Sequence, residues 1–214
     1  MLQVRSFTFN PFQENTYLIV NEQGSCWIVD PGMYDAEETN RFSSYITANG
    51  LKPKAVINTH THLDHIFGVQ WCKNQYQIPF LMHEKDLPVL QGAKGSAMLF
   101  GFQFTDIPQS DGFLRENESL ALEEEQLQIR FTPGHSPGSV IFFYEKGGWL
   151  IGGDVLFNGS IGRTDLPGGN FNTLIQSIKT ELFSLSDDVI VYPGHGPSTT
   201  IGHEKLTNPF LKDI

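Results

Sequence analysis

The 214-residue sequence has few of the features that mark secreted or membrane proteins. Its two cysteines, Cys26 and Cys72, lie far apart and form no CxxC pattern, which argues against a disulfide framework and predicts buried thiols in a reducing compartment. No apolar run approaches the roughly 18 residues that a membrane-spanning helix needs. The N-terminus starts with strand-like alternation and not with an apolar leader. These absences predict a cytoplasmic protein with no membrane partner.

Basic residues are also scarce, because 14 Lys and Arg stand against 24 Asp and Glu, a net charge of −10 with His neutral. They are scattered singly, with no cluster beyond Lys52 and Lys54, so we expect no nucleic-acid partner. The hydrophobic content of 39% is ordinary for a soluble globular chain of this length, which can bury a sizeable core. We predict a single domain over residues 1–214; the oligomeric state is left open.

The hydrophobic pattern gives two similar halves. In the first half, strands are predicted at 2–9, 16–20 and 26–29, then a helix between Asp35 and Gly50, a strand at 55–57, a helix over about 66–75 and a strand at 80–82. In the second half, strands at 127–131, 140–144 and 149–151 precede a helix over about 173–183, capped by Asn172, and a strand at 189–192. This order predicts an α/β fold in which two mixed sheets pack face to face between helices, a four-layer αββα sandwich.

Residues 84–112 do not fit this pattern. They contain dense apolar side chains among glycines, namely Met98, Leu99, Phe100, Phe102 and Phe104. We interpret these side chains as core packing, and a wall of a substrate pocket is the alternative.

The sequence THTHLDH at residues 59–65 contains three of the seven histidines, with an aspartate among them. In an extended segment, side chains two residues apart point the same way, so His60 and His62 can face one point. Asp64 and His65 lie where the chain turns into a helix and can face a second point beside it. Imidazole and carboxylate together suit zinc, iron or manganese. A polar loop whose histidines contact only water is the alternative, and it suits a lone histidine better than this cluster.

Three more metal-binding side chains, His135, Asp154 and His195, each follow a short apolar strand and a glycine that permits a sharp turn. The ends of strands are where open α/β sheets place their sites. Seven ligands exceed the roughly four that one zinc ion takes, so we predict two ions that share a bridging carboxylate. The seven are His60, His62, Asp64, His65, His135, Asp154 and His195. The remaining histidines, His83 and His203, lack this context and are interpreted as structural.

THTHLDH, with TPGH at 132–135, GGD at 152–154 and GH at 194–195, resembles the metallo-β-lactamase superfamily. NPFQENTYLI at 10–19, GSIGRTDLPGGN at 159–170 and GHGPSTTIGHEKLTNPF at 194–210 are similar to the short bacterial glyoxalase II-like hydrolases. The resemblance implies one ion on His60, His62 and His135, another on Asp64, His65 and His195, and Asp154 as the bridge between them. It implies that a metal-bridging hydroxide, supported by Asp64 and Asp154, hydrolyses a small acyl-thiol such as S-lactoylglutathione or a similar acylglutathione. The ions would be two zinc ions, with iron or manganese as alternatives.

The sequence departs from this family in two respects. Neither cysteine lies near a motif, although the commonest metallo-β-lactamases use one as a ligand. Long glyoxalase II enzymes hold glutathione with a C-terminal helical domain, and only 19 residues follow His195, so we expect no such domain here. Arg163, nine residues after Asp154, is our candidate for binding substrate carboxylates. An ion pair with Asp165 that holds the loop is the alternative.

Other functions remain open from the sequence. A related persulfide dioxygenase would use one iron on His60, His135 and Asp154. A nuclease of this fold is disfavoured by the acidic charge, and a lactonase and a non-catalytic metal-binding scaffold are further alternatives. Residues 134–138 match GxSxG, but they lie between two strands and not at the strand-to-helix turn of a nucleophile elbow, so Ser136 is interpreted as a turn residue.

Overall fold

The computed structural model describes residues 1–212, which form two six-stranded mixed sheets and a small two-stranded one. The first sheet has the order β1 (Gln3–Phe9), β2 (Glu14–Val20), β3 (Ser25–Val29), β4 (Lys52–Ile57), β5 (Phe80–His83) and β6 (Gly112–Leu114). The second has the order β14 (Thr199–Thr200), β13 (Ile190–Pro193), β10 (Trp149–Gly153), β9 (Val140–Tyr144), β8 (Glu125–Phe131) and β7 (Ser119–Leu122). Strands β11 (Leu156–Phe157) and β12 (Ser160–Ile161) pair separately.

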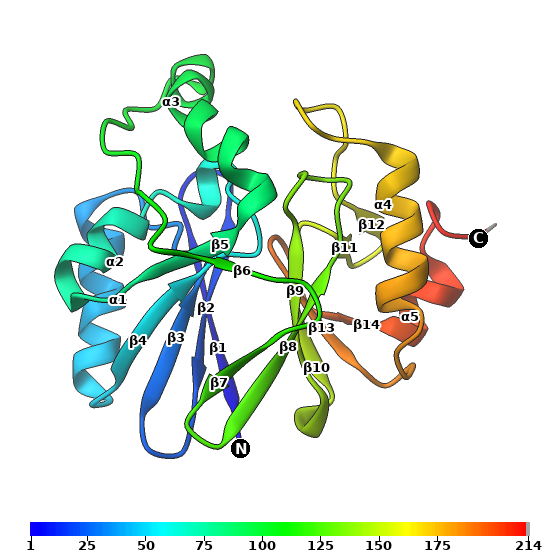
Figure 1. Cartoon of the computed structure of the whole chain (residues 1–214), viewed down its shortest axis with the longest axis horizontal. Coiled ribbons are helices and arrows are strands. Elements are labelled where there is room, and N and C mark those ends of the chain that lie inside the picture. Colours follow the sequence, from blue (N-terminus) through cyan, green and yellow to red (C-terminus); the bar gives the residue numbers. More distant parts are fainter. Residues whose placement is uncertain (213–214) are drawn as a thin grey trace.

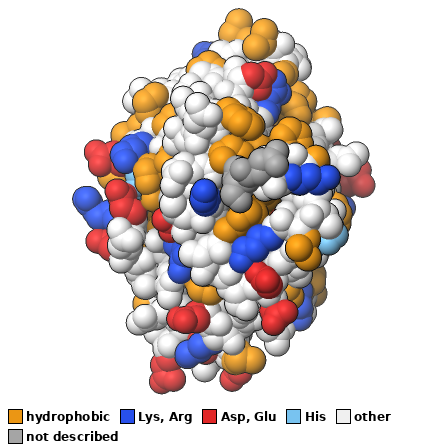
Figure 2. Space-filling model, turned by 90° about the vertical axis from the view of Figure 1, so that its right-hand side faces the viewer, with side chains coloured by type: hydrophobic (Ala, Val, Ile, Leu, Met, Phe, Trp, Pro, Cys, Tyr) orange, Lys and Arg blue, Asp and Glu red, His pale blue; other side chains and the backbone are white. Residues whose placement is uncertain are grey.

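Helices cover the outer face of each sheet, which confirms the predicted four-layer sandwich (Figure 1). Helices α1 (Ala36–Ala48) and α2 (Val69–Tyr76) lie outside the first sheet, and α3 (Leu87–Phe100) lies at one end of the molecule. Helix α4 (Phe171–Ser177), continued by a π-helical turn (Ile178–Leu182), and α5 (Ile201–Thr207) lie outside the second sheet. Figure 2 shows acidic and basic side chains interspersed over that side of the molecule. None of the helices in residues 1–212 has the length and apolar character to cross a bilayer.

The strands carry apolar side chains on both faces, because each sheet is covered on both sides. In β9, Phe142 belongs to the core between the two sheets, whereas Ile141 and Phe143 pack in the core beneath α4 and α5. In β3, Trp27 belongs to the central core and Ile28 to the core beneath α1 and α2. Successive side chains of a strand point to opposite faces, so one apolar run serves two cores.

The ends of several strands meet at one edge of the sandwich. Strands β3 and β4 are parallel, β10 and β13 are parallel, and β8 runs the same way as β10 because both are antiparallel to β9. Backbone hydrogen bonds join the two sheets here: Asn15 N donates to Gly194 O at 2.7 Å, and Val140 N donates to Thr59 O at 2.9 Å. The loops after these strands therefore lie against one another.

Several sequence-based details are wrong. Helix α4 begins earlier than predicted, because Asn170 and not Asn172 is its N-cap and accepts a hydrogen bond from Thr173 N at 2.9 Å. A 3₁₀ turn, Leu63–His65, precedes α2, which starts at Val69. Helix α3 and strands β6 and β7 were not predicted. The core interpretation fails for Leu99, whose side chain is 80% exposed, and likewise for Met98 and Phe100, whereas Phe102 and Phe104 do pack against the core.

Candidate metal centre

Three histidine nitrogens meet at the end of the first sheet. His62 Nδ1 lies 2.8 Å from His135 Nε2, which lies 3.2 Å from His60 Nε2. Two nitrogens on one tetrahedral zinc ion, at Zn–N distances near 2.05 Å, are about 3.3 Å apart. The first group, His60, His62 and His135, therefore has the spacing that one ion requires.

On the outer side of the His135 and His60 rings, one ring nitrogen makes a hydrogen bond, so the other nitrogen directs its lone pair inward. His135 Nδ1 donates to Arg163 O at 2.7 Å, so its Nε2 is free to bind. Thr59 Oγ1 donates its proton to Asp30 at 2.5 Å and so accepts from His60 Nδ1 at 3.1 Å. Lone pairs that face one another at these distances repel unless a cation lies between them. Outer partners of this kind are the usual support of metal-binding histidines.

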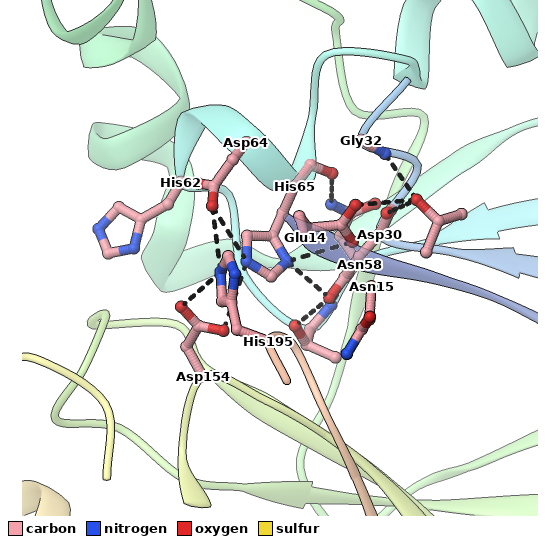
Figure 3. Close-up of polar contacts among 12 residues, drawn as sticks. Glu14, Asn15, Asp30, Gly32, Asn58, His62, Asp64, His65, Asp154 and His195 are labelled. Atoms are coloured by element: carbon pink, nitrogen blue, oxygen red, sulfur yellow. Dashed lines mark hydrogen bonds and ion pairs between the residues drawn. The ribbon is translucent and has the colours of Figure 1, made fainter. Parts of the chain in front are cut away.

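The second group, Asp64, His65 and His195, lies beside the first. Asp64 Oδ2 is 3.2 Å from His195 Nε2 and 3.8 Å from His65 Nε2. His65 Nδ1 donates to Asp30 Oδ2 at 3.1 Å, and His195 Nδ1 donates to Phe12 O at 3.1 Å, so both Nε2 atoms face inward. Figure 3 shows the side chains of Asp64, His65 and His195 converging, with Asp30 behind His65.

Asp154 directly follows β10, and Figure 3 shows its side chain beside that of His195. Its Oδ2 is 3.5 Å from His135 Nε2 in the first group and 3.5 Å from His195 Nε2 in the second, and its Oδ1 is 3.4 Å from His65 Nε2. This is the position that a bridging carboxylate would occupy. The structure thus brings all seven predicted ligands together, although they come from four loops of both sheets.

Unpartnered buried atoms support a cation site here. Within residues 1–212, Asp154 Oδ1 and His65 Nε2 are buried and make no well-formed hydrogen bond, although they lie 3.4 Å from each other. Bound divalent ions would satisfy both atoms. Gly194 keeps this space open, because a Cβ at that position would collide with Asp154 Oδ1 and lie 2.8 Å from His65 Cε1.

The two groups differ in their proton affinity. Burial, together with the neighbouring imidazoles, lowers the pKa of His60 well below its ordinary value and that of His62 to about 3. Burial also disfavours the charged form of His65, but Asp154 and Asp64 outweigh it and raise its pKa well above the ordinary value. Burial is outweighed in the same way at His195, where hydrogen bonds to Asp154 and Asp64 raise the pKa to about 9. His60 and His62 therefore present neutral nitrogens, whereas His65 and His195 hold protons that a metal must displace.

A buried carboxylate pair beneath His65 was missed in the sequence. Asp30 is 1% exposed, accepts from Thr59 N at 2.7 Å and contacts His65 on its outer side. Glu14 Oε1 lies 3.9 Å from the same His65 nitrogen, and burial raises the pKa of this carboxyl well above its ordinary value. Asp30 follows the end of β3 directly, as other site residues follow their strands, and that position was the available signal.

Asp86, a second missed carboxylate, is fully buried at the start of α3 and joins two loops of the first group. Its side chain accepts from Thr61 N at 2.6 Å, between His60 and His62. It also accepts from Gly138 N at 2.7 Å and from the Ser136 hydroxyl, just after His135. Ser136 is therefore held in a turn, as predicted.

Arg163 contributes to the site through its backbone carbonyl, which accepts from His135. Its guanidinium makes two hydrogen bonds of 2.7 Å to Asp165, and both side chains are more than half exposed. The ion pair is the contact that the loop-holding alternative requires. Arg163 also lines the cavity described next, so it could contact a substrate there, and its role in substrate binding stays a prediction.

A cavity of about 780 Å³ opens over the candidate metal ligands, between α3 and residues 157–168. His62, Asp64, His135, Asp154 and His195 form its floor. Away from that floor its walls are mainly apolar. The other two histidines lie outside this cavity: His83 Nε2 contacts Glu116 at 2.9 Å, and the side chain of His203 is half exposed.

Comparisons with known proteins agree with this geometry. The Metallo-beta-lactamase superfamily model matches residues 9–195. The chain is 39% identical to "Probable metallo-hydrolase YqgX" of Bacillus subtilis (strain 168), covering 97% of this chain and 96% of that protein. It is 38% identical to "Hydroxyacylglutathione hydrolase GloC" of Haemophilus influenzae, covering 94% and 93%. The crystal structure of TTHA1623 in a di-iron-bound form superposes with a TM-score of 0.87 at 38% identity, over 97% of this chain and all of that one. The chain therefore belongs to the metallo-β-lactamase superfamily of metallo-hydrolases.

Proposed function

We propose that this protein is a thioester hydrolase that acts on S-lactoylglutathione or a similar acylglutathione and uses two divalent ions, preferably zinc. The observation that carries the proposal is the pair of three-residue groups joined by Asp154 at the floor of one cavity. The first group would hold one ion, the second group the other, and Asp154 would bind both. The similarity to the GloC hydrolase supports the choice of substrate.

When bound, two such ions would supply an acidified water and polarise the substrate carbonyl. The chain's own contribution is to fix the ligand atoms before substrate arrives. Asp30 and the carbonyl of Arg163 orient His65 and His135 by accepting their outer protons. Only Asp64 and Asp154 contribute negative charge at the floor, so two divalent ions would leave a net positive charge where the carbonyl oxygen must bind.

The reaction adds water across the acyl C–S bond: the oxygen joins the acyl carbon, and the thiolate leaves and takes a proton. Thiolate is a good leaving group, so the site needs no dedicated general acid. Among the described residues that line the cavity, Arg163 is the only ionisable side chain apart from the metal ligands. This wall chemistry suits a thioester better than an amide.

A mononuclear dioxygenase is the second candidate, because His60, His135 and Asp154 do lie close together. Asp154 is equally close to His195 of the second group, however, which favours two ions.

The test is to load the purified protein with zinc, to measure bound metal by mass spectrometry, and to assay S-lactoylglutathione by thiol release. We expect two ions per chain and turnover that is lost on chelation. Oxygen uptake on glutathione persulfide by a one-iron form, without thiol release from the thioester, would favour the dioxygenase.

A further inference from the structure

Helix α3 presents three distinct faces. Leu90, Ala93 and Ala97 are buried against the core of the first sheet. Gln91 and Lys94 are exposed and lie outside the cavity lining. The third face lines the cavity over the metal ligands with Val89, Gly92, Gly95, Ser96 and Leu99, which recur at helical spacing. No residue of α3 that lines the cavity is charged.

Two glycines on this face leave open space. Gly92 and Gly95 lie inside the helix and have no left-handed φ, so the backbone does not require glycine there. A Cβ at either position would meet nothing within 4 Å. Glycine is a poor helix former compared with alanine. What these glycines provide is therefore room beside the helix, on the side of the cavity.

The mouth of this space carries exposed apolar side chains. Leu99 is 80% exposed, Phe100 44% and Phe12 36%, and the rings of Phe12 and Phe100 meet edge to face at 5.8 Å. All three side chains line the cavity, and the carbonyl of Phe12 also holds His195. An apolar surface that continues to a metal site is a place where an apolar part of the substrate can be buried.

We propose that the α3 side of the cavity is a subsite for an apolar acyl chain, which rests on the thioester hydrolysis proposed above. The acyl carbon lies over Asp64 and Asp154, the chain runs along the face from Val89 to Leu99, and the thiol carrier points toward Arg163. The ten residue steps from Val89 to Leu99 extend about 15 Å along the helix, enough for a medium-length chain. The preferred substrates are thus medium-chain acyl thioesters, with small polar acyl groups such as lactoyl as poorer ones.

The first measurement is kcat/KM for acetyl-, butyryl-, hexanoyl- and octanoyl-glutathione. Each methylene that becomes fully buried should raise kcat/KM about fourfold, so the series should rise by one to several orders of magnitude. A flat series would overturn the subsite.

The second measurement uses Gly92→Leu and Gly95→Leu, which fill the open space without straining the helix. Either variant should lower the ratio of octanoyl to acetyl kcat/KM at least tenfold. Gln91→Leu places the same side chain on the same helix outside the cavity and should leave the ratio within twofold. An equal effect of Gln91→Leu would assign the change to the helix and not to the subsite.

A binding assay separates the subsite from the hydrolysis. S-methyl- to S-octylglutathione are thioethers that cannot be hydrolysed, and their Kd by calorimetry should fall with chain length in the wild type but not in Gly92→Leu. Length-dependent binding without cleavage of any thioester would defeat the proposed function and leave the subsite standing. Cleavage of thioesters with length-independent binding would defeat the subsite alone.

Discussion

Replacing Asp86 by alanine should remove one metal ion and lower stability together. The carboxylate accepts four hydrogen bonds from two loops: from Thr61 N, Thr61 Oγ1, Gly138 N and the Ser136 hydroxyl. The hydroxyls can rotate to other partners, but the two backbone N–H groups cannot. A buried unsatisfied donor costs about 1–3 kcal/mol, and truncation of a buried charged network typically costs about 3–5 kcal/mol in the free energy of unfolding.

For a chain of this length, 1 kcal/mol shifts the Tm by about 2–4 °C, so Asp86→Ala should lower the Tm by about 6–20 °C. Thermal unfolding is measured by circular dichroism in a chelator, so that metal binding does not contribute. The backbone groups that Asp86 holds lie next to the first group, with Thr61 between His60 and His62 and Gly138 three residues after His135, whereas Asp64 and His65 lie further along the loop, in the 3₁₀ turn. Zinc content should therefore fall from two ions per chain toward one.

Asp35→Ala is the matched control, because Asp35 also accepts from a backbone N–H at a helix start, Glu38 N at 2.9 Å, but is exposed. It should cost about 1 kcal/mol and leave both ions bound. An Asp86→Ala protein that keeps two ions and a Tm within 2 °C of the wild type would refute the reasoning.

Three further predictions concern the metal ligands and the cavity rim. Asp154→Asn keeps the shape but removes the charge shared by both groups, so it should loosen both ions at once; normal metal content would show that Asp154 is not the bridge. Arg163→Ala should raise KM for a glutathione thioester with little effect on a small neutral one, and metal content should stay unchanged because the backbone carbonyl still holds His135; equal loss on both substrates would favour the loop-holding pair with Asp165. In metal-stripped protein at pH 7, the raised pKa values of His65 and His195 keep both side chains protonated. Zinc binding to the second group should therefore release about two protons, and the zinc affinity of that group should fall as the pH falls. Calorimetry in two buffers of different ionisation enthalpy measures the number of protons released, and a number near zero would contradict this prediction.

The sequence was sufficient to predict that these seven side chains meet, because they follow four strands whose ends converge when the sheets stack. It could not reveal Asp86, which belongs to none of the motifs and lies within residues 84–112, where no helix or strand was predicted. Its partners Thr61 and Gly138 are 25 and 52 residues away, and no local pattern reports contacts at that separation. Asp30 differs in this respect, because it directly follows a strand as the candidate ligands do.

Helix α3 escaped prediction for a different reason. Its glycines weaken the helical signal, and its apolar residues Leu99 and Phe100 face a cavity instead of a core, which breaks the usual amphipathic period. Apolar composition alone does not distinguish a core face from the wall of an open cavity, and here Leu99 and Phe100 belong to such a wall. The prediction of Asn172 as the N-cap of α4 failed because Asn170, two residues earlier, offers the same capping side chain.

Each metal group takes ligands from both sheets, and this makes a bound ion a cross-link. His60 and His135 are 75 residues apart and belong to opposite halves of the sandwich, as do His65 and His195. An ion bound to ligands from both halves would oppose the separation of the two sheets, so its main effect would be to slow unfolding. The half-life of the folded chain, and its resistance to proteases, would then track the supply of metal in the surroundings.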